Sequence, residues 1–365
     1  MTFDRWWALP AVGLAATWWW GARHGGRFDG QTVLITGGSR GLGLLLAREF
    51  ASRGARLVIC ARDVAELERA RAELVARYGA EVLARRCDVA DRSQVEALVQ
   101  QATARFGGVD VLVNNAGIIQ VGPAITMSEQ DFRDSLEINL WGMIHATRAV
   151  LPQMRQRRRG RILDITSIGG VVAVPHLLPY TVAKFASVGL STGLGAELRA
   201  DGVQVTTVVP GLMRTGSFLH ALAKGQREKE VQWFALGASL PLISMDAERA
   251  ARKMVDACYR GDRWCTVGLP AKALRIAAAV APGAVQAILE QVQRVLPGPG
   301  GARTAQRAEP GWRHRAGLAR SFVTRLGDRA ARRNNELPPV AHRCAGLSTR
   351  FAMQALLAGP VRRGI

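Results

Sequence analysis

From residue 31 onward, the sequence alternates short β-branched runs with helical stretches, and this pattern restricts the fold more than any other feature. Strands that are separated by helices join through right-handed crossovers, which gives a parallel sheet with helices on both faces. We therefore predict an α/β fold with a doubly wound parallel sheet of about seven strands. The expected strands lie within 32–36, 56–61, 81–89, 109–117, 160–167, 203–211 and 263–268.

Changes in composition predict four regions along the chain. Residues 1–30 form a hydrophobic N-terminal segment, 31–270 carry the alternating pattern, 271–300 form an amphipathic helical extension, and 301–365 form a loosely ordered tail. The tail contains 13 arginines and no lysine, which suits anionic lipid or nucleic acid. It lacks the regular aromatic residues of a base-stacking surface, and arginine is abundant throughout the chain. We therefore expect a compositional bias rather than a nucleic-acid partner.

The N-terminal segment includes 17 uncharged residues, 6–22, which hold five of the nine tryptophans. A helix of that length reaches about 25 Å, close to the lower limit for spanning a bilayer core. Three interpretations stay open: a membrane anchor, a secretory signal peptide, and a helix packed on the protein's own surface. The signal peptide is the weakest, because paired tryptophans flank the stretch and no small-x-small cleavage site follows.

Charges around this segment favour the anchor and set its orientation. Basic residues follow it, which places the body on the cytoplasmic side of a membrane, the inner membrane in a bacterium. Without an anchor, we expect a cytoplasmic protein. The loops that enter the expected strands also predict a basic edge beside the segment, suited to an anionic membrane surface. They carry Arg53, Arg56, Arg77, Arg105, the run 155–161 and Arg199.

A glycine-rich turn, "TGGSRGLG" at 36–43, follows the first expected strand and opens a helix. Its glycines at 37, 41 and 43 allow a sharp turn and close approach of a pyrophosphate, which a helix N-terminus stabilises. At the start of a series of alternating strands and helices, the turn predicts a dinucleotide site. The five scattered cysteines have no CxxC spacing, so we expect neither a disulfide framework nor a metal site.

Four motifs in order resemble those of the short-chain dehydrogenase/reductase family. They are the glycine turn, "NNAG" at 114–117, Ser167, and "YTVAK" at 180–184, and the resemblance covers roughly residues 31–268. It implies a Rossmann-type sheet, NAD(P)-dependent oxidoreduction, and a homodimer or homotetramer. The intact set of Ser167, Tyr180 and Lys184 speaks against the alternative, a non-catalytic dinucleotide-binding sensor or scaffold.

The resemblance also implies roles for individual residues. Tyr180 is the proton donor, Lys184 lowers the pKa of its phenol, Ser167 binds the substrate oxygen, and Asn139 shapes a water relay to the lysine. An ordinary phenol has a pKa of about 10, so it needs such help near neutral pH. The implied cofactor-binding residues are Gly37, Ser39, Arg40, Gly41, Leu42, Gly43, Arg62, Asp88, Val89, Asn115, Ala116, Gly117, Tyr180, Lys184, Pro210, Gly211 and Thr215.

The choice of cofactor depends on the residue that ends the second strand, because it lies near the adenosine ribose. An acid there would bind the 2′-hydroxyl of NAD and repel the 2′-phosphate of NADP. The resemblance places Ala61 at this position, with Arg62 next to it and Arg40 in the glycine turn. Two guanidinium groups and no acid favour NADP(H) over NAD(H). A shift of two residues would bring the carboxylate of Asp63 there instead.

The segment after "PG" at 210–211 closes over the substrate in this family, and here it is long and rich in Leu, Met, Phe and Trp. His176, Leu177 and Leu178, just before the tyrosine, also point to an apolar mouth. These residues favour a small lipophilic alcohol or ketone of the steroid, retinoid or long-chain type. An equally good alternative is that they only pack the lid.

Overall fold

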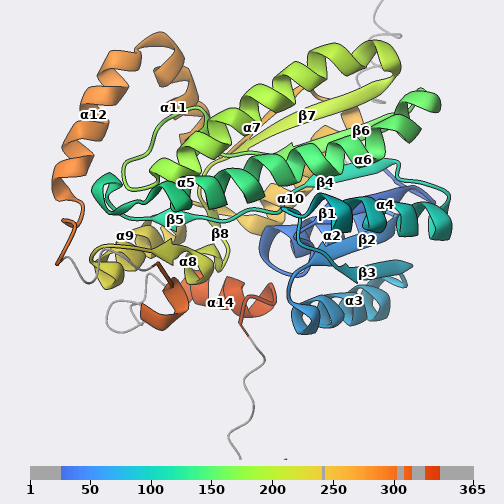
Figure 1. Cartoon of the computed structure of the whole chain (residues 1–365), viewed down its shortest axis with the longest axis horizontal. Coiled ribbons are helices and arrows are strands. Elements are labelled where there is room, and N and C mark those ends of the chain that lie inside the picture. Colours follow the sequence, from blue (N-terminus) through green and yellow to red (C-terminus); the bar gives the residue numbers. More distant parts are fainter. Residues whose placement is uncertain (1–25, 241–242, 302–307, 315–324, 338–365) are drawn as a thin grey trace, which may run out of the picture.

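The computed structural model describes residues 26–240, 243–301, 308–314 and 325–337 (Figure 1). The expected anchor at 6–22 lies outside these residues. Within them, no helix combines the length and the apolar character that crossing a bilayer requires.

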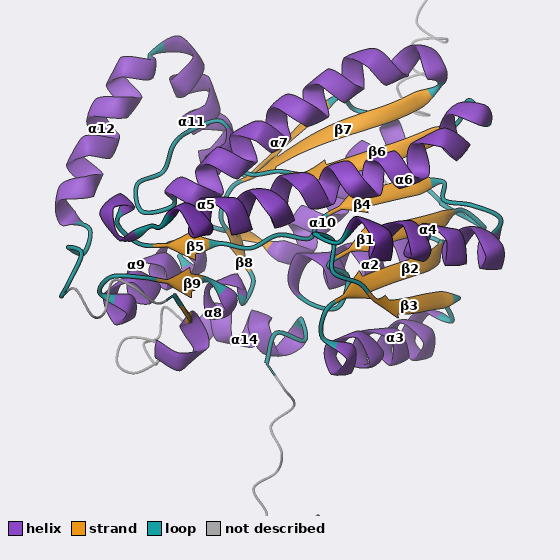
Figure 2. Cartoon of the chain, in the orientation of Figure 1, coloured by secondary structure: helices purple, strands orange, loops and turns teal. Residues whose placement is uncertain are grey.

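Seven parallel strands form the central sheet, which confirms the predicted α/β fold class (Figure 2). Their spatial order is β11-β7-β6-β4-β1-β2-β3, so the direction of strand addition reverses between β1 and β4. In open parallel sheets, ligands bind beyond the carboxyl ends of the strands at this reversal. The strands are β1 Thr32–Thr36, β2 Arg56–Ala61, β3 Val82–Arg86, β4 Val111–Asn114, β6 Gly160–Ile165, β7 Val203–Pro210 and β11 Trp264–Val267.

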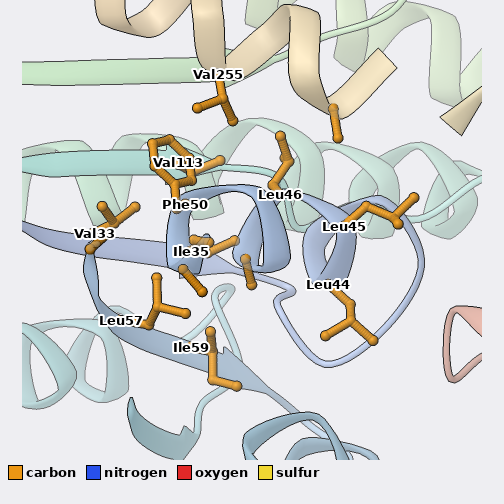
Figure 3. Close-up of a cluster of buried hydrophobic side chains, with 14 of the residues drawn as sticks. Val33, Ile35, Leu44, Leu45, Leu46, Phe50, Leu57, Ile59, Val113 and Val255 are labelled. Atoms are coloured by element: carbon orange, nitrogen blue, oxygen red, sulfur yellow. The ribbon is translucent and has the colours of Figure 1, made fainter. Parts of the chain in front are cut away.

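Helices cover both faces of the sheet, because their apolar stripes and the continuous β-branched strands bury one another. One face carries α2 Gly41–Ala51, α3 Val64–Tyr78 and α10 Ala247–Arg260. The other carries α4 Arg92–Phe106, α6 Gly142–Gln156 and α7 Leu178–Glu197. Figure 3 shows part of the first core, where side chains of β1, β2 and β4 meet α2 and α10: Val33, Ile35, Leu57, Ile59, Val113, Leu44, Leu45, Leu46, Phe50 and Val255.

Short elements close the carboxyl ends of the strands. The lid after β7 contains β8 Met213–Arg214, α8 Ser217–His220, β9 Leu222–Ala223 and α9 Arg227–Ser239, and β10 Met245–Asp246 leads into α10. α5 Glu129–Leu136 runs through a π-helical turn, Glu137–Trp141, into α6. Beyond β11, α11 Leu269–Val280 and α12 Pro282–Val295 form a hairpin that extends to the side of the sheet (Figure 1).

Two described parts of 301–365, residues 308–314 and 325–337, contact the rest of the fold. β12 Glu309–Pro310 pairs with β9, and α14 Arg325–Arg333 packs beside the lid. After α14 the chain turns toward the glycine-rich turn, and Asn334 and Glu336 are buried there. Tertiary contacts order this stretch despite its polar composition.

One member of the predicted basic edge is not a surface charge. The side chain of Arg53 is only 8% exposed and forms ion pairs with Glu49 at 2.6 Å and with Asp256 at 2.7 Å. It also donates to the Gly26 carbonyl. Burial of a guanidinium requires such partners, so Arg53 stabilises the strand-start edge instead of adding positive charge to it.

Candidate active site

A cavity of about 1170 Å³ lies at the carboxyl ends of the central strands. It exceeds the roughly 300–1,000 Å³ of an ordinary small-ligand pocket, as a dinucleotide together with a substrate would need. Every residue to which the sequence analysis gave a catalytic or cofactor role lines this cavity. Their individual roles stay predictions.

The glycine turn has the shape of a cradle that side chains would fill. Gly37 and Gly41 have φ of +66° and +55°, which disfavours other residues. A Cβ on Gly43 would collide with the carbonyl oxygen of Gly37 and lie 2.6 Å from Asn115 Nδ2. The turn therefore leaves bare backbone at the N-terminus of α2, and this fits a pyrophosphate.

The "NNAG" motif fixes the back of this turn. Asn115 Nδ2 donates to the carbonyls of Thr36 and Gly37 at 3.0 and 3.1 Å. The backbone N–H groups of Asn115 and Ala116 both donate to the Thr36 hydroxyl, at 3.0 and 3.1 Å. Because β4 and β1 are neighbours, the motif holds the turn from the adjacent strand.

Ser167, Tyr180 and Lys184 converge on the cavity from the end of β6 and from α7. The Lys184 ammonium lies 5.7 Å from the centroid of the Tyr180 ring and donates to the Ile165 carbonyl at 3.0 Å. Burial raises the pKa of Tyr180, and its hydrogen bond with Ser167 opposes that rise. The family resemblance implies a lowered pKa, but in the chain alone burial outweighs the effect of the neighbours.

Asn139 lies in the π-helical turn and is nearly fully buried. Its amide Nδ2 donates to the carbonyls of Ile118 and Ser135, whereas its Oδ1 has no partner in the described part of the chain. A second cavity of about 10 Å³ is lined by Asn139 and Lys184. This is close to the roughly 10–15 Å³ that one water molecule needs.

The sequence analysis missed Asp164, a fully buried acid in β6. Its Oδ1 accepts from Asn114 Nδ2 at 2.8 Å, and burial raises its pKa to about 6. Burial lowers the pKa of Lys184 to about 8, and the charge of Asp164 opposes that change. An aspartate inside the otherwise apolar run "ILDI" was the available signal, because buried strands exclude unpartnered acids.

At the adenosine end, Ala61 closes β2 and Arg62 projects beside it with a side chain that is 62% exposed. Arg62 lies 3.9 Å from Asp88 Oδ2. Arg40 donates to Glu66 of α3 at 3.0 Å, so part of its charge is neutralised. Glu66 was also missed. Because its carboxylate pairs with Arg40, Arg62 is the guanidinium group that remains more available for a phosphate.

Asp63, the acid that a shifted register would bring to the ribose, also lines the cavity, but it has a second role. Its carboxylate accepts from the backbone N–H of Glu66 at 2.8 Å and caps the N-terminus of α3. Capping occupies one of the two carboxylate oxygens, Oδ1, and satisfies a helix N–H that would otherwise lack a partner.

The segment after α14 contributes another wall of the cavity that the sequence analysis did not anticipate. The Glu336 carboxylate accepts from the Gly216 backbone N–H, and its Oε1 lies 2.8 Å from where a Cβ on Gly41 would stand. Burial raises the pKa of Glu336 to about 8.

The substrate end of the cavity is mostly apolar. Leu177 contributes to it, whereas Leu178 is exposed outside it. His176 is buried outside the cavity, and its Nδ1 lies 3.0 Å from the Glu230 carboxylate. Of the three residues expected at the mouth, only Leu177 is there. Other apolar lining residues are Ile118, Ile119, Val174, Leu212, Met213, Leu222, Trp233, Phe234, Ile243, Met245, Leu269 and Leu274.

Comparison with known proteins agrees with this geometry. The family model described as short chain dehydrogenase matches residues 31–224. Oxidoreductase UcpA of Salmonella typhimurium is 40% identical over 192 residues, which cover 52% of this chain and 72% of that protein.

Two solved structures share the fold over most of their length. A short-chain dehydrogenase from Streptomyces avermitilis is 30% identical with a TM-score of 0.62, covering 72% of this chain and 98% of its own. L-Sorbose reductase from Gluconobacter frateurii, complexed with NADPH and L-sorbose, is 27% identical with a TM-score of 0.60. That match covers 67% of this chain and 97% of the reductase.

Proposed function

This chain belongs to the short-chain dehydrogenase family of NAD(P)-dependent oxidoreductases, and we propose that it transfers a hydride between NADP(H) and a lipophilic alcohol or ketone. The observation that carries the proposal is the convergence of Ser167, Tyr180 and Lys184 on a largely apolar cavity that also contains the glycine turn. When bound, the nicotinamide supplies or accepts the hydride.

The side chains handle the proton. In the reductive direction, the Ser167 hydroxyl binds the substrate oxygen and the Tyr180 phenol donates its proton to that oxygen. The Lys184 ammonium, 5.7 Å from the ring, stabilises the phenolate that results and so offsets the effect of burial. At neutral pH most Lys184 is charged, because its pKa is about 8.

A water in the small cavity lined by Asn139 and Lys184 relays a proton from solvent to the lysine, which keeps the ammonium charged beside Tyr180. The partnerless Asn139 Oδ1 supports this role, because a buried amide oxygen without a partner is costly and a water would satisfy it. Gly117 keeps the large cavity open beside the same two residues, since a Cβ there would lie 2.6 Å from Asn139 Oδ1 and 3.8 Å from Lys184 Nζ.

The preference for NADP rests mainly on Arg62. Its exposed guanidinium follows Ala61, where an NAD-preferring site would carry an acid. The NADPH complex of L-sorbose reductase supports the same choice. Glu66 reduces the contribution of Arg40, because the two already form an ion pair. The lipophilic substrate is supported by the apolar side chains in the lining, among them Trp233, Phe234 and Leu177.

Titration of the purified chain with NADPH and with NADH tests the cofactor proposal. We expect tighter binding of NADPH, and Arg62→Gln should weaken it by about tenfold, the effect of one charged hydrogen bond, while NADH binding stays unchanged. Arg71→Gln, on the exposed face of α3, is the matched control. Equal affinities for both dinucleotides in the unaltered chain would contradict the preference for NADP.

A screen of lipophilic ketones with NADPH tests the reaction. Tyr180→Phe should reduce turnover at saturating NADPH by roughly 10²–10⁴-fold, the usual contribution of a general acid. Tyr259→Phe, outside the cavity, controls for the loss of a hydroxyl. Full turnover by Tyr180→Phe would contradict the role of Tyr180 as the general acid. Turnover of sugars alone would contradict a lipophilic substrate.

A further inference from the structure

The segment that follows α14 runs alongside the glycine turn. The Gly41 N–H donates to the Asn334 carbonyl at 2.9 Å, and Asn335 Nδ2 donates to the Ser39 carbonyl at 2.9 Å. Residues Asn334 to Leu337, which we name the strap, therefore lie against the backbone that receives a pyrophosphate in a dinucleotide fold.

Specific contacts hold the strap in place. Arg48 of α2 donates to Asn334 Oδ1 at 3.2 Å and to the Arg333 carbonyl at 2.8 Å. Arg69 of α3 donates to Asn335 Oδ1 at 2.8 Å. The strap is thus fixed from both helices that flank the turn.

Glu336 is the strap residue that faces the cavity. Its side chain is buried between Gly41 and Gly216, so it stands at the N-terminus of α2 without full solvation. A bound diphosphate would place negative charge next to this carboxyl group. A protonated carboxyl group can donate a hydrogen bond to a phosphate oxygen. A carboxylate can only accept hydrogen bonds, and its negative charge would repel the phosphate.

We propose that the strap is part of the cofactor site and that Glu336 binds the cofactor's diphosphate in its protonated form, so that binding is coupled to proton uptake by this one residue. The inference rests on the proposed function. The neutral acid is already favoured before a ligand binds, because burial raises the pKa of Glu336 to about 8.

Other ionisable groups face Glu336 from the elements around it. Arg40 of the glycine turn lowers its pKa and Glu66 of α3 raises it. The His220 ring of α8 lies 3.1 Å from the Glu336 carbonyl, and burial lowers the pKa of that histidine to about 4, so it is neutral. Lys184 also lines the cavity and titrates near pH 8. A test must therefore compare two proteins rather than rely on one pH profile.

The test measures the dissociation constant of NADPH, and of NADH in parallel, at pH 7, 8 and 9 for the full chain and for Glu336→Gln. With a pKa near 8, ionisation of Glu336 weakens binding by about tenfold between pH 7 and 9. Glutamine cannot ionise, so the variant should lack this tenfold component. Calorimetry in two buffers of different ionisation enthalpy should detect close to one proton taken up at pH 9 by the unaltered chain only.

The matched control is Glu248→Gln, which removes a carboxylate that pairs with Arg333 at 3.3 Å outside the cavity. It should keep the pH dependence of the unaltered chain. Thermal unfolding checks that Glu336→Gln is folded, and Glu336→Asp, which keeps an ionisable group, should keep the proton uptake.

Two outcomes overturn the inference. Equal pH dependence and equal proton uptake in the unaltered chain and Glu336→Gln would show that the carboxyl group does not meet the diphosphate. Much tighter binding by Glu336→Gln already at pH 7 would show that the strap competes with the cofactor instead of contacting it. If neither dinucleotide binds at any pH, the proposed function itself fails.

Discussion

Gly43 lies where the glycine turn has no space for even one additional carbon atom. It is buried in the first turn of α2, and its missing side chain lets the Gly37 carbonyl and Asn115 pack directly against the helix. Both neighbours are fixed, one by the backbone and one by two hydrogen bonds. Neither can move away to admit a methyl group.

We therefore expect Gly43→Ala to lower the free energy of unfolding by about 1–3 kcal/mol, the usual effect of overpacking, and to abolish cofactor binding. Gly193→Ala in α7 is the matched substitution, because a Cβ there meets nothing within 4 Å. It should raise stability by about 0.5–1 kcal/mol through helix propensity. Urea denaturation measures both, and equal effects at the two positions would contradict the packing argument.

At the level of elements, the sequence reveals features that depend on local patterns but not those that depend on long-range contacts. The seven strands and the glycine turn were predictable because each has its signal within about ten residues. The strap was not, because "NNEL" is polar and its partners lie in α2 and α3. Asp164 and Glu66 were missed for a related reason, since the partner of a charged residue cannot be read from its neighbours in the sequence.

Arg48 links α2 to the strap, so its removal should release the strap selectively. It is buried and also binds Glu73 through two hydrogen bonds of 2.7 and 2.8 Å. In Arg48→Ala, we expect amide hydrogen exchange to accelerate in residues 325–337 and in the N-terminal part of α3, with the sheet unchanged. Arg92→Ala breaks an exposed pair with Glu96 and should change exchange only locally. Uniform acceleration across the sheet in Arg48→Ala would indicate global destabilisation instead.

Across the whole molecule, the chain enters the described body at the edge where the strands begin, opposite the cavity. Phe28 donates its N–H to the Arg53 carbonyl at 2.8 Å and packs on Phe50 and Tyr259. Exposed arginines at the same edge include Arg77, 64% exposed, and Arg159, 75% exposed. A membrane attachment through residues 6–22 would leave the cavity facing away from the bilayer, and we keep it as a prediction.

Flotation with lipid vesicles tests this attachment. The full chain should float with vesicles that contain anionic lipid, less so with neutral vesicles, because the basic edge adds an electrostatic contribution. A chain without residues 1–27 should stay at the bottom of the gradient. If it still floats, the C-terminal arginines become the candidate for lipid binding, whereas failure of the full chain to float would contradict attachment altogether.

The hydrogen bond between Asn335 and Ser39 joins groups 296 positions apart. A ribosome therefore makes the glycine turn 296 residues before its partner. A product of premature termination can keep Ser167, Tyr180 and Lys184 and still lack the wall that Glu336 supplies. Under the role proposed for Glu336, tight retention of the nucleotide then reports that synthesis has run past residue 337.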